Sequence, residues 1–189
     1  MTRYPSIRLS FDCSSRNKDL TVQRADFALR IGPLHDSSLI AMLLAEVRYA
    51  LVAQPAFLKS QAPANHPLDL IKWPSIRNHI DGLLLPWRLV HNSESFDVDP
   101  VNPLLSDDLL VSASLALCGA GLANLPMPLV KDHIARGELV SVFEQWMPPS
   151  RNLFLVYANR EHLPSKSIVF IDFFKEKQLE VQSLLADTR

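Results

Sequence analysis

The sequence predicts an α/β protein with a mostly parallel sheet, arranged as two lobes. Segments with strand patterns alternate with segments of helical spacing, an order typical of α/β folds. Hydrophobic residues make up 48% and charged residues 21% of the 189 positions, the balance of a globular chain with a substantial core. Extended segments dominate residues 25–60, whereas helical signals cluster over 104–185. We therefore expect the chain to cross between two lobes near residues 45–55 and 150–160.

The first third of the chain is mainly extended. Apolar Ile7, Leu9 and Phe11 alternate with polar residues, which is the period of a strand with one buried face. Gly32-Pro33 ends a later strand pattern, because this pair breaks regular structure. The expected elements are a strand over residues 6–12, a short helix over 18–23, a strand over 25–31, extended segments over 39–45 and 47–53, and a short helix over 55–60.

The rest of the chain alternates helices with short strands. Asp107 or Asp108 is expected to cap a helix that Gly119 ends, and Gly137 ends the next one. Prolines at 86, 100 and 103 interrupt the extended patterns there, so any strand over 97–105 must be short or at an edge. The expected elements are a helical turn over 68–72, strands over 83–91, 122–125, 139–143 and 151–158, and helices over 109–117, 128–136 and 166–185.

Composition excludes several classes of protein. The net charge of −1 gives no field that attracts nucleic acid or an anionic membrane. No apolar run approaches the roughly 18 residues of a membrane span, and the N-terminus lacks the apolar region of a signal peptide, so we expect a cytoplasmic protein. Cys13 and Cys118 cannot build a disulfide framework. We expect Cys118, which lies among apolar residues, to be a small buried hydrophobe.

No catalytic or metal-binding signature is present. The six histidines have no ligand spacing, so we expect them to be solvated or capping residues and expect neither metal nor cofactor. Gly119-Ala-Gly121 ends a helix, whereas a phosphate-binding loop precedes one. Asp107 and Asp108 could form a carboxylate pair for acid–base chemistry, but helix capping is the favoured interpretation. A binding module is therefore expected rather than an enzyme.

A series of motifs in order along the chain resembles the effector-binding domain of LysR-type transcriptional regulators. In that family a strand ending in Arg-x-Gly precedes an Asp-Ser-Ser-Leu turn, as Arg30-Ile-Gly32 precedes Asp36-Ser-Ser-Leu39 here. Each motif alone is weak, but together they cover residues 4–175. The other matching segments are Gln54-Pro-Ala-Phe-Leu58, His66-Pro-Leu-Asp-Leu70, Asp107-Asp108, Leu117–Pro126, Gly137-Glu-Leu-Val140, Leu153–Tyr157 and Phe170-Ile-Asp-Phe173.

The resemblance implies a type 2 periplasmic-binding-protein-like fold, in which crossover strands join two α/β lobes and a small molecule binds in the cleft. It implies that residues 1–50 and 158–189 form lobe I and residues 51–157 form lobe II. The family's effector-binding positions correspond to Ser14, Ser15, Ile31, Gly32, Pro33, Arg77, Asp107 and Asp108. Turn geometry or capping explains several of these equally well, and Arg77 is slightly favoured as a solvated surface residue.

The implied partner is a small-molecule effector, a small organic acid or an aromatic compound, and a homodimer or higher oligomer is possible. Asp107 stands where the family usually has Asn. Because it adds a second acid beside Asp108, an effector whose carboxylate binds at that position is disfavoured. The family's N-terminal winged helix-turn-helix and the first strand and helix of lobe I are expected to be absent, so this chain should not bind DNA itself. The alternatives are a stand-alone solute-binding protein and an α/β enzyme using Asp107 and Asp108.

Overall fold

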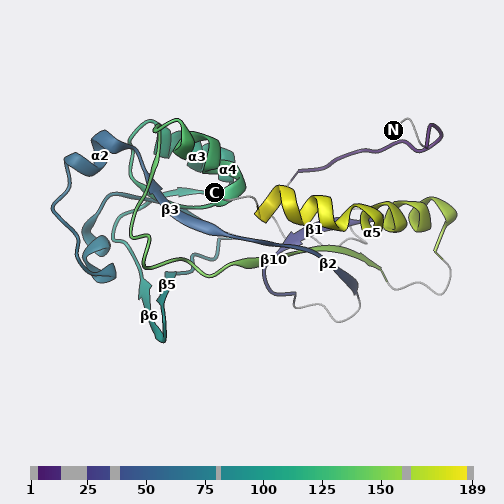
Figure 1. The fold of residues 1–189 in the computed structure, drawn as a ribbon, viewed down its shortest axis with the longest axis horizontal. Helices are drawn as coiled ribbons and strands as arrows, with labels where there is room; N and C mark the ends of the chain where they lie inside the picture. The colour runs from purple at the N-terminus through teal and green to yellow at the C-terminus, as the bar shows by residue number, and fades with distance from the viewer. Residues whose placement is uncertain (1–3, 14–24, 35–38, 80–81, 159–162, 187–189) are drawn as a thin grey trace.

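The computed structural model describes residues 4–13, 25–34, 39–79, 82–158 and 163–186. Two sheets and their helices form an elongated molecule (Figure 1). The first sheet has the strand order β1-β10-β2, and the second has the order β7-β4-β8-β3-β9. The chain passes from the first sheet to the second at Arg48, between β2 (Leu39–Val47) and β3 (Tyr49–Ala53). It returns between β9 (Val140–Ser141) and β10 (Arg151–Ala158).

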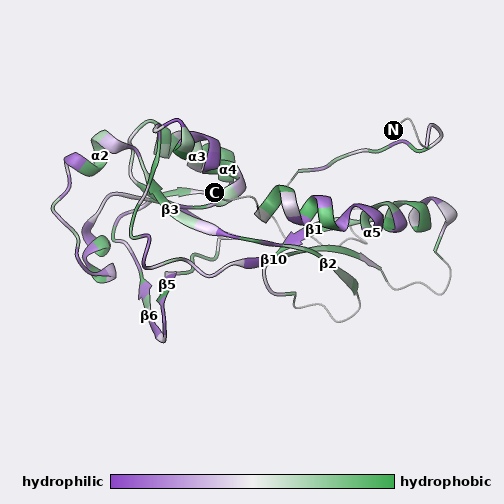
Figure 2. Ribbon diagram, viewed as in Figure 1, coloured by the Kyte–Doolittle hydropathy of each residue, from purple (hydrophilic) through white to green (hydrophobic). Residues whose placement is uncertain are grey.

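The first sheet is antiparallel throughout. β10 lies at its centre and pairs with β1 (Ala28–Ile31) on one side and β2 on the other. The helix α5 (Ser165–Ala186) lies along this sheet (Figure 1). Phe170 of α5 stacks on Phe27 with ring centroids 4.6 Å apart, and Gln178 Nε2 donates to the Leu43 carbonyl. Hydrophobic and hydrophilic residues alternate along α5 (Figure 2), and several of its large apolar side chains, including Leu179 and Leu184, are exposed.

The second sheet mixes strand directions. β4 (Ser75–Asn78) is parallel to both β7 (Leu104–Ser106) and β8 (Leu122–Pro126), whereas β3 is antiparallel to β8 and β9. The predicted mostly parallel sheet is therefore wrong. The period of an apolar pattern indicates a strand, but the direction of its neighbours depends on long-range connections that the pattern does not contain.

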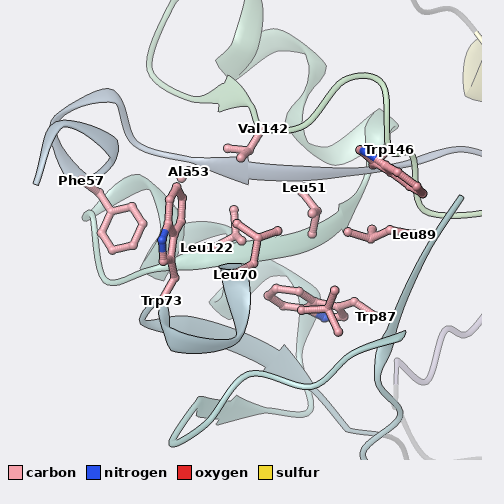
Figure 3. Packing of buried hydrophobic residues seen from close by; sticks show 11 residues of the cluster. Leu51, Ala53, Phe57, Leu70, Trp73, Trp87, Leu89, Leu122, Val142 and Trp146 are labelled. Carbon is pink, nitrogen blue, oxygen red and sulfur yellow. The ribbon is translucent and has the colours of Figure 1, made fainter. Parts of the chain in front are cut away.

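Two apolar clusters cover opposite faces of the second sheet. On one face, α3 (Leu109–Leu117) and α4 (Met127–Ala135) pack on alternate residues of β3 and β8. On the other face lie α2 (Pro55–Lys59), the 3₁₀ helix η1 (Pro67–Lys72) and the hairpin of β5 (Trp87–His91) and β6 (Glu94–Val98). Leu51, Leu70 and Leu122 occupy the centre of this second cluster, between Trp73 and Trp87 (Figure 3).

Most predicted elements are present. The strands over 25–31, 122–125 and 151–158 are confirmed as β1, β8 and β10, and the helices over 109–117, 128–136 and 166–185 as α3, α4 and α5. Gly119 and Gly137 follow helices with φ of 76° and 70°, as a helix-ending glycine requires. The expected extended segments appear as β2, β3 and β9, and the short helices as α2 and η1.

Several predictions need correction. Residues 6–12 form no strand, because no described strand offers them a ladder. The strand expected over 83–91 begins only at Trp87, after Pro86. β4 was not predicted, since its four residues are mainly polar. Cys118 is exposed rather than buried, because it caps the C-terminal end of α3 and is not among the buried residues of that helix. The helix expected over 18–23 lies outside the described residues, and the predicted lobe boundaries stay a prediction.

A candidate effector pocket at the junction of the two sheets

A surface pocket of about 300 Å³ lies where β1 ends and β10 begins. This volume is at the lower end of the roughly 300–1,000 Å³ of small-molecule sites. The start of β10 is also where the chain returns from the second sheet, so the pocket lies beside the connection between the two sheets. Its lining residues come from two segments: Gly32, Pro33 and Leu34 after β1, and Ser150, Arg151, Asn152 and Phe154 at the start of β10.

Backbone pairing holds the two segments of the pocket together. Ile31 faces Leu153 across the β1–β10 ladder, and Gly32 N donates to Asn152 O at 3.0 Å. Gly32 then turns the chain with a φ of 101°, a conformation that residues with a side chain rarely adopt. A Cβ atom at this position would meet nothing within 4 Å, so the requirement for glycine comes from the dihedral angle rather than from crowding.

Arg151 provides a positive charge at the pocket. Its guanidinium lies over the ring of buried Tyr49, 4.8 Å from the centroid, in a cation–π arrangement that orients the side chain. Burial raises the pKa of the Tyr49 hydroxyl, while the charge of Arg151 opposes that shift. Beside it, Ser150 Oγ donates to a carboxylate oxygen of Glu46 in β2. The polar side of the pocket thus combines a fixed cation with a serine already held by an acid.

The predicted effector residues fall into three groups. Gly32 and Pro33 line the pocket, and Ile31, which is 40% exposed, immediately precedes them. Ser14 and Ser15 lie outside the described residues. Arg77, Asp107 and Asp108 belong to the second sheet and its helix α3 and do not line this pocket.

Arg77 is not the surface residue that the sequence favoured. Only 2% of its side chain is exposed, in β4 between β7 and β8 of the second sheet. Its Nη1 bonds to the Asp99 carboxylate, and its Nη2 donates to the Leu85 carbonyl at 2.5 Å. Leu85 precedes β5 and Asp99 follows β6, so this guanidinium ties together both ends of the β5–β6 hairpin. The prediction that Arg77 lies on the surface is wrong. Its partners Leu85 and Asp99 lie 8 and 22 positions away in the sequence, and no local pattern indicates that they contact Arg77.

Asp108 caps α3, as predicted. Its Oδ1 accepts from Leu110 N at 2.7 Å and from Val111 N at 3.0 Å. Ser106 Oγ accepts from Asp108 N, which fixes the approach of β7 to the helix. Asp107 is exposed. His66 likewise caps η1 through Nδ1, which accepts from Leu68 N at 3.2 Å, as the capping interpretation of the histidines expected.

Sequence reasoning missed the β10 side of the pocket. Arg151, Asn152 and Phe154 belong to a correctly predicted strand, and Ser150 immediately precedes it, but nothing local indicates that this strand pairs with β1. Pro148-Pro149 immediately before them marks the return of the chain and was the available signal. Among the described residues, no three His, Cys, Asp or Glu side chains gather as a metal site. No helix of the described residues is long and apolar enough to cross a membrane.

The family model of the LysR substrate binding domain matches residues 1–179 of the chain. The fold, with two α/β lobes joined by crossing strands, agrees with this match. The chain therefore belongs to the LysR substrate-binding domain family and has its type 2 periplasmic-binding-protein-like fold.

Solved regulatory domains of LysR-type regulators share this architecture. The regulatory domain of the C227S variant of AphB from Vibrio vulnificus superposes with a TM-score of 0.80 at 30% identity, covering 94% of this chain and 87% of that one. The regulatory domain of CrgA from Neisseria meningitidis gives a TM-score of 0.77 at 27% identity, covering 94% and 87%.

Curated relatives are longer proteins. The HTH-type transcriptional regulator PtxR of Pseudomonas aeruginosa is 30% identical over 174 residues, which are 92% of this chain and 56% of PtxR. The chain thus spans about half the length of the curated relatives that it matches. The family and these relatives are transcriptional regulators rather than enzymes, and the chain is homologous to their effector-binding part.

Proposed function

We propose that this chain is a sensor that binds a small-molecule effector in the pocket formed by Gly32–Leu34 and Ser150–Phe154. The observation that carries the proposal is the coincidence of two independent results. The pocket contains Gly32 and Pro33, the positions at which the LysR resemblance implies effector binding. It also lies at the connection between the sheets, where a ligand can bias their relative orientation.

The chemistry of the lining favours a small organic acid with an apolar or aromatic body. Pro33, Leu34 and Phe154 offer apolar surface, and Arg151 offers a cation whose planar guanidinium suits a carboxylate. We therefore propose that the acid group of the effector binds at Arg151, away from the acidic pair Asp107 and Asp108. In a full-length regulator, the bias between the sheets would pass to an N-terminal DNA-binding domain in the cytoplasm, and this chain alone would not bind DNA.

A thermal-shift screen tests the proposal. Aliphatic and aromatic monocarboxylates are compared with their neutral amides, which have nearly the same shape. A ligand at 100 times its Kd adds roughly 2.7 kcal/mol to stability, or about 5–10 °C for a domain of this size. We expect the carboxylates alone to raise the melting temperature, Arg151→Met to abolish the shift, and Arg88→Met, an exposed arginine outside the pocket, to leave it unchanged.

Glu46→Gln supplies a second variant, because it removes an acid next to the pocket and should strengthen carboxylate binding. Equal shifts with acids and amides, or a shift that survives Arg151→Met, would exclude an acidic effector at this position. The absence of any shift at millimolar concentrations of the whole panel would count against the pocket itself.

A further inference from the structure

Arg151 of the first sheet contacts Tyr49 of the second sheet where the chain crosses between the two. Tyr49 is the first residue of β3, directly after the crossing at Arg48, and Arg151 is the first residue of β10, after the chain has returned. The guanidinium carbon of Arg151 lies 4.8 Å from the centroid of the Tyr49 ring. The cation that lines the candidate pocket is therefore supported by a side chain from the other sheet.

The ring of Tyr49 has a fixed position. Tyr49 is 6% exposed, and it stands opposite Pro126 in the β3–β8 ladder. The neighbouring residues are joined as well, because Met127 N donates to the Arg48 carbonyl at 2.8 Å. Close packing restricts a buried side chain to few rotamers. Tyr49 therefore presents a constant aromatic face to the pocket side of the crossing.

Arg151, in contrast, is exposed. An arginine side chain has several rotatable bonds, and ordering it at the moment of binding costs free energy that lowers affinity. Of the ion pairs formed between described residues, none includes Arg151, so in this part of the chain no acid neutralises its charge. Contact with an aromatic face orders the guanidinium and leaves its positive charge available to a carboxylate.

We infer that Tyr49 is a positioning residue for the effector: its ring orders Arg151 in the free protein, so that the acid group of the effector meets a cation already in place. The inference rests on the proposed function, because it assigns a role in the same site to a residue that does not line the pocket. It also gives the second sheet a share in binding. The affinity for the effector then depends on how the two sheets are placed at the crossing.

Three variants separate the ring contact from general packing. Tyr49→Phe keeps the ring and Tyr49→Leu removes it, while Phe57→Leu, at an 8% exposed residue packed on the second sheet, is the matched control. The NMR signal of the Arg151 Nε–H group is assigned by its loss in Arg151→Met, and the ring current of Tyr49 displaces it from the position of a solvated arginine. We expect the displacement to persist in Tyr49→Phe and Phe57→Leu and to disappear in Tyr49→Leu.

Calorimetric titration with a monocarboxylate measures the effect on binding. Loss of the preordered side chain should weaken binding about two- to tenfold in Tyr49→Leu, whereas Tyr49→Phe and Phe57→Leu should bind as the unaltered chain does. If no carboxylate binds the unaltered chain, the proposed function is wrong, and the Nε–H signals still decide whether Tyr49 orders Arg151.

Arg151→Met supplies a measurement that needs no substitution in the core, because Arg151 is exposed. Burial raises the pKa of the Tyr49 hydroxyl, and the charge of Arg151 opposes this shift. Removal of the charge should therefore raise the pKa of Tyr49 further, which carbon-13 NMR of the tyrosine ring follows directly.

Three results would overturn the inference. The Nε–H displacement could survive in Tyr49→Leu, or disappear in Tyr49→Phe as well. The carboxylate affinity of folded Tyr49→Leu could equal that of the unaltered chain, or Phe57→Leu could lose as much. The pKa of Tyr49 could be the same with and without the Arg151 side chain.

Discussion

The two sheets of this protein differ in how completely they are covered. All five residues of β3 in the second sheet are buried, and apolar clusters pack against both faces of that sheet. In the first sheet, Leu29 of β1 and Leu43 of β2 remain 57% and 43% exposed. The second sheet thus has a core of its own, whereas the first depends on α5 and leaves apolar surface open.

This difference places the candidate site at the boundary between a completely covered sheet and a partly covered one. The residues that line the pocket belong to the first sheet and its flanking segments. Tyr49, on which Arg151 packs, is the first residue of the fully buried strand β3. Regions with fewer buried apolar contacts open at a lower free-energy cost than a packed core. We therefore expect a ligand that binds at this boundary to stabilise mainly the first sheet.

The largest effect is expected from the core of the second sheet. Leu122 is fully buried in the cluster of Figure 3, and Leu122→Ala should lower the free energy of unfolding by about 2–5 kcal/mol. Leu29→Ala, on the exposed edge of the first sheet, should change it by less than about 0.5 kcal/mol. Urea unfolding followed by tryptophan fluorescence reports on the second sheet, because Trp73, Trp87 and Trp146 all lie in that cluster. Equal losses in the two variants would contradict the difference between the sheets.

The next effect concerns Arg77. Arg77→Met removes the guanidinium that joins the two ends of the β5–β6 hairpin and leaves the Leu85 carbonyl without this donor. We expect a loss of about 1–3 kcal/mol, with faster amide exchange in β5 and β6. Asp99→Asn is the milder control, because the Asp99 side chain is 72% exposed and stays solvated. If the hairpin kept its protection in Arg77→Met, the role of Arg77 in holding the hairpin would be wrong.

A smaller effect is expected at the start of α3. Asp108→Ala removes the acceptor of two backbone N–H groups and should cost about 1 kcal/mol. The neighbouring Asp107→Ala is the matched control and should be nearly neutral. The midpoints of urea unfolding for the two variants provide the measurement. A similar shift in both would show that the charge near the helix end matters and the cap geometry does not.

The smallest effect concerns Glu138, which follows α4. Its bonds with Arg136 and His133 lower the pKa of the carboxyl from 4.5 to about 2. The stabilisation from this ionised group is therefore complete above pH 4.5 and is lost as the pH falls toward 2. Glu138→Gln should reduce the pH dependence of stability within this window and nowhere else. Parallel curves for the variant and the unaltered chain between pH 2 and 4.5 would rule out this contribution.

Local patterns predicted most elements of both sheets but not how they pair. The capping of α3 by Asp108 and its end at Gly119 follow from residues within one or two helical turns, and these predictions are confirmed. The alternation in residues 6–12 is equally clear, yet no strand forms there, because a strand requires a neighbour that the pattern does not specify. The prediction of a mostly parallel sheet is wrong for the same reason, because the pattern does not specify which strands become neighbours.

The candidate site was half predictable. Gly32 and Pro33 stand out as a turn after a strand, and the family resemblance adds their role. Arg151 carries no local signal, since its position over Tyr49 and beside Gly32 depends on the pairing of β10 with β1 and β2. The contacts of buried Arg77 with Leu85 and Asp99 likewise depend on how the segments flanking the β5–β6 hairpin fold.

Hydrogen–deuterium exchange with a carboxylate that raises the melting temperature tests the central claim most directly. The pocket predicts that added ligand slows amide exchange in two separate segments, residues 32–34 and 150–154, and that Arg151→Met removes both effects. Protection confined to the second sheet, or unchanged in Arg151→Met, would contradict effector binding at the junction of the two sheets.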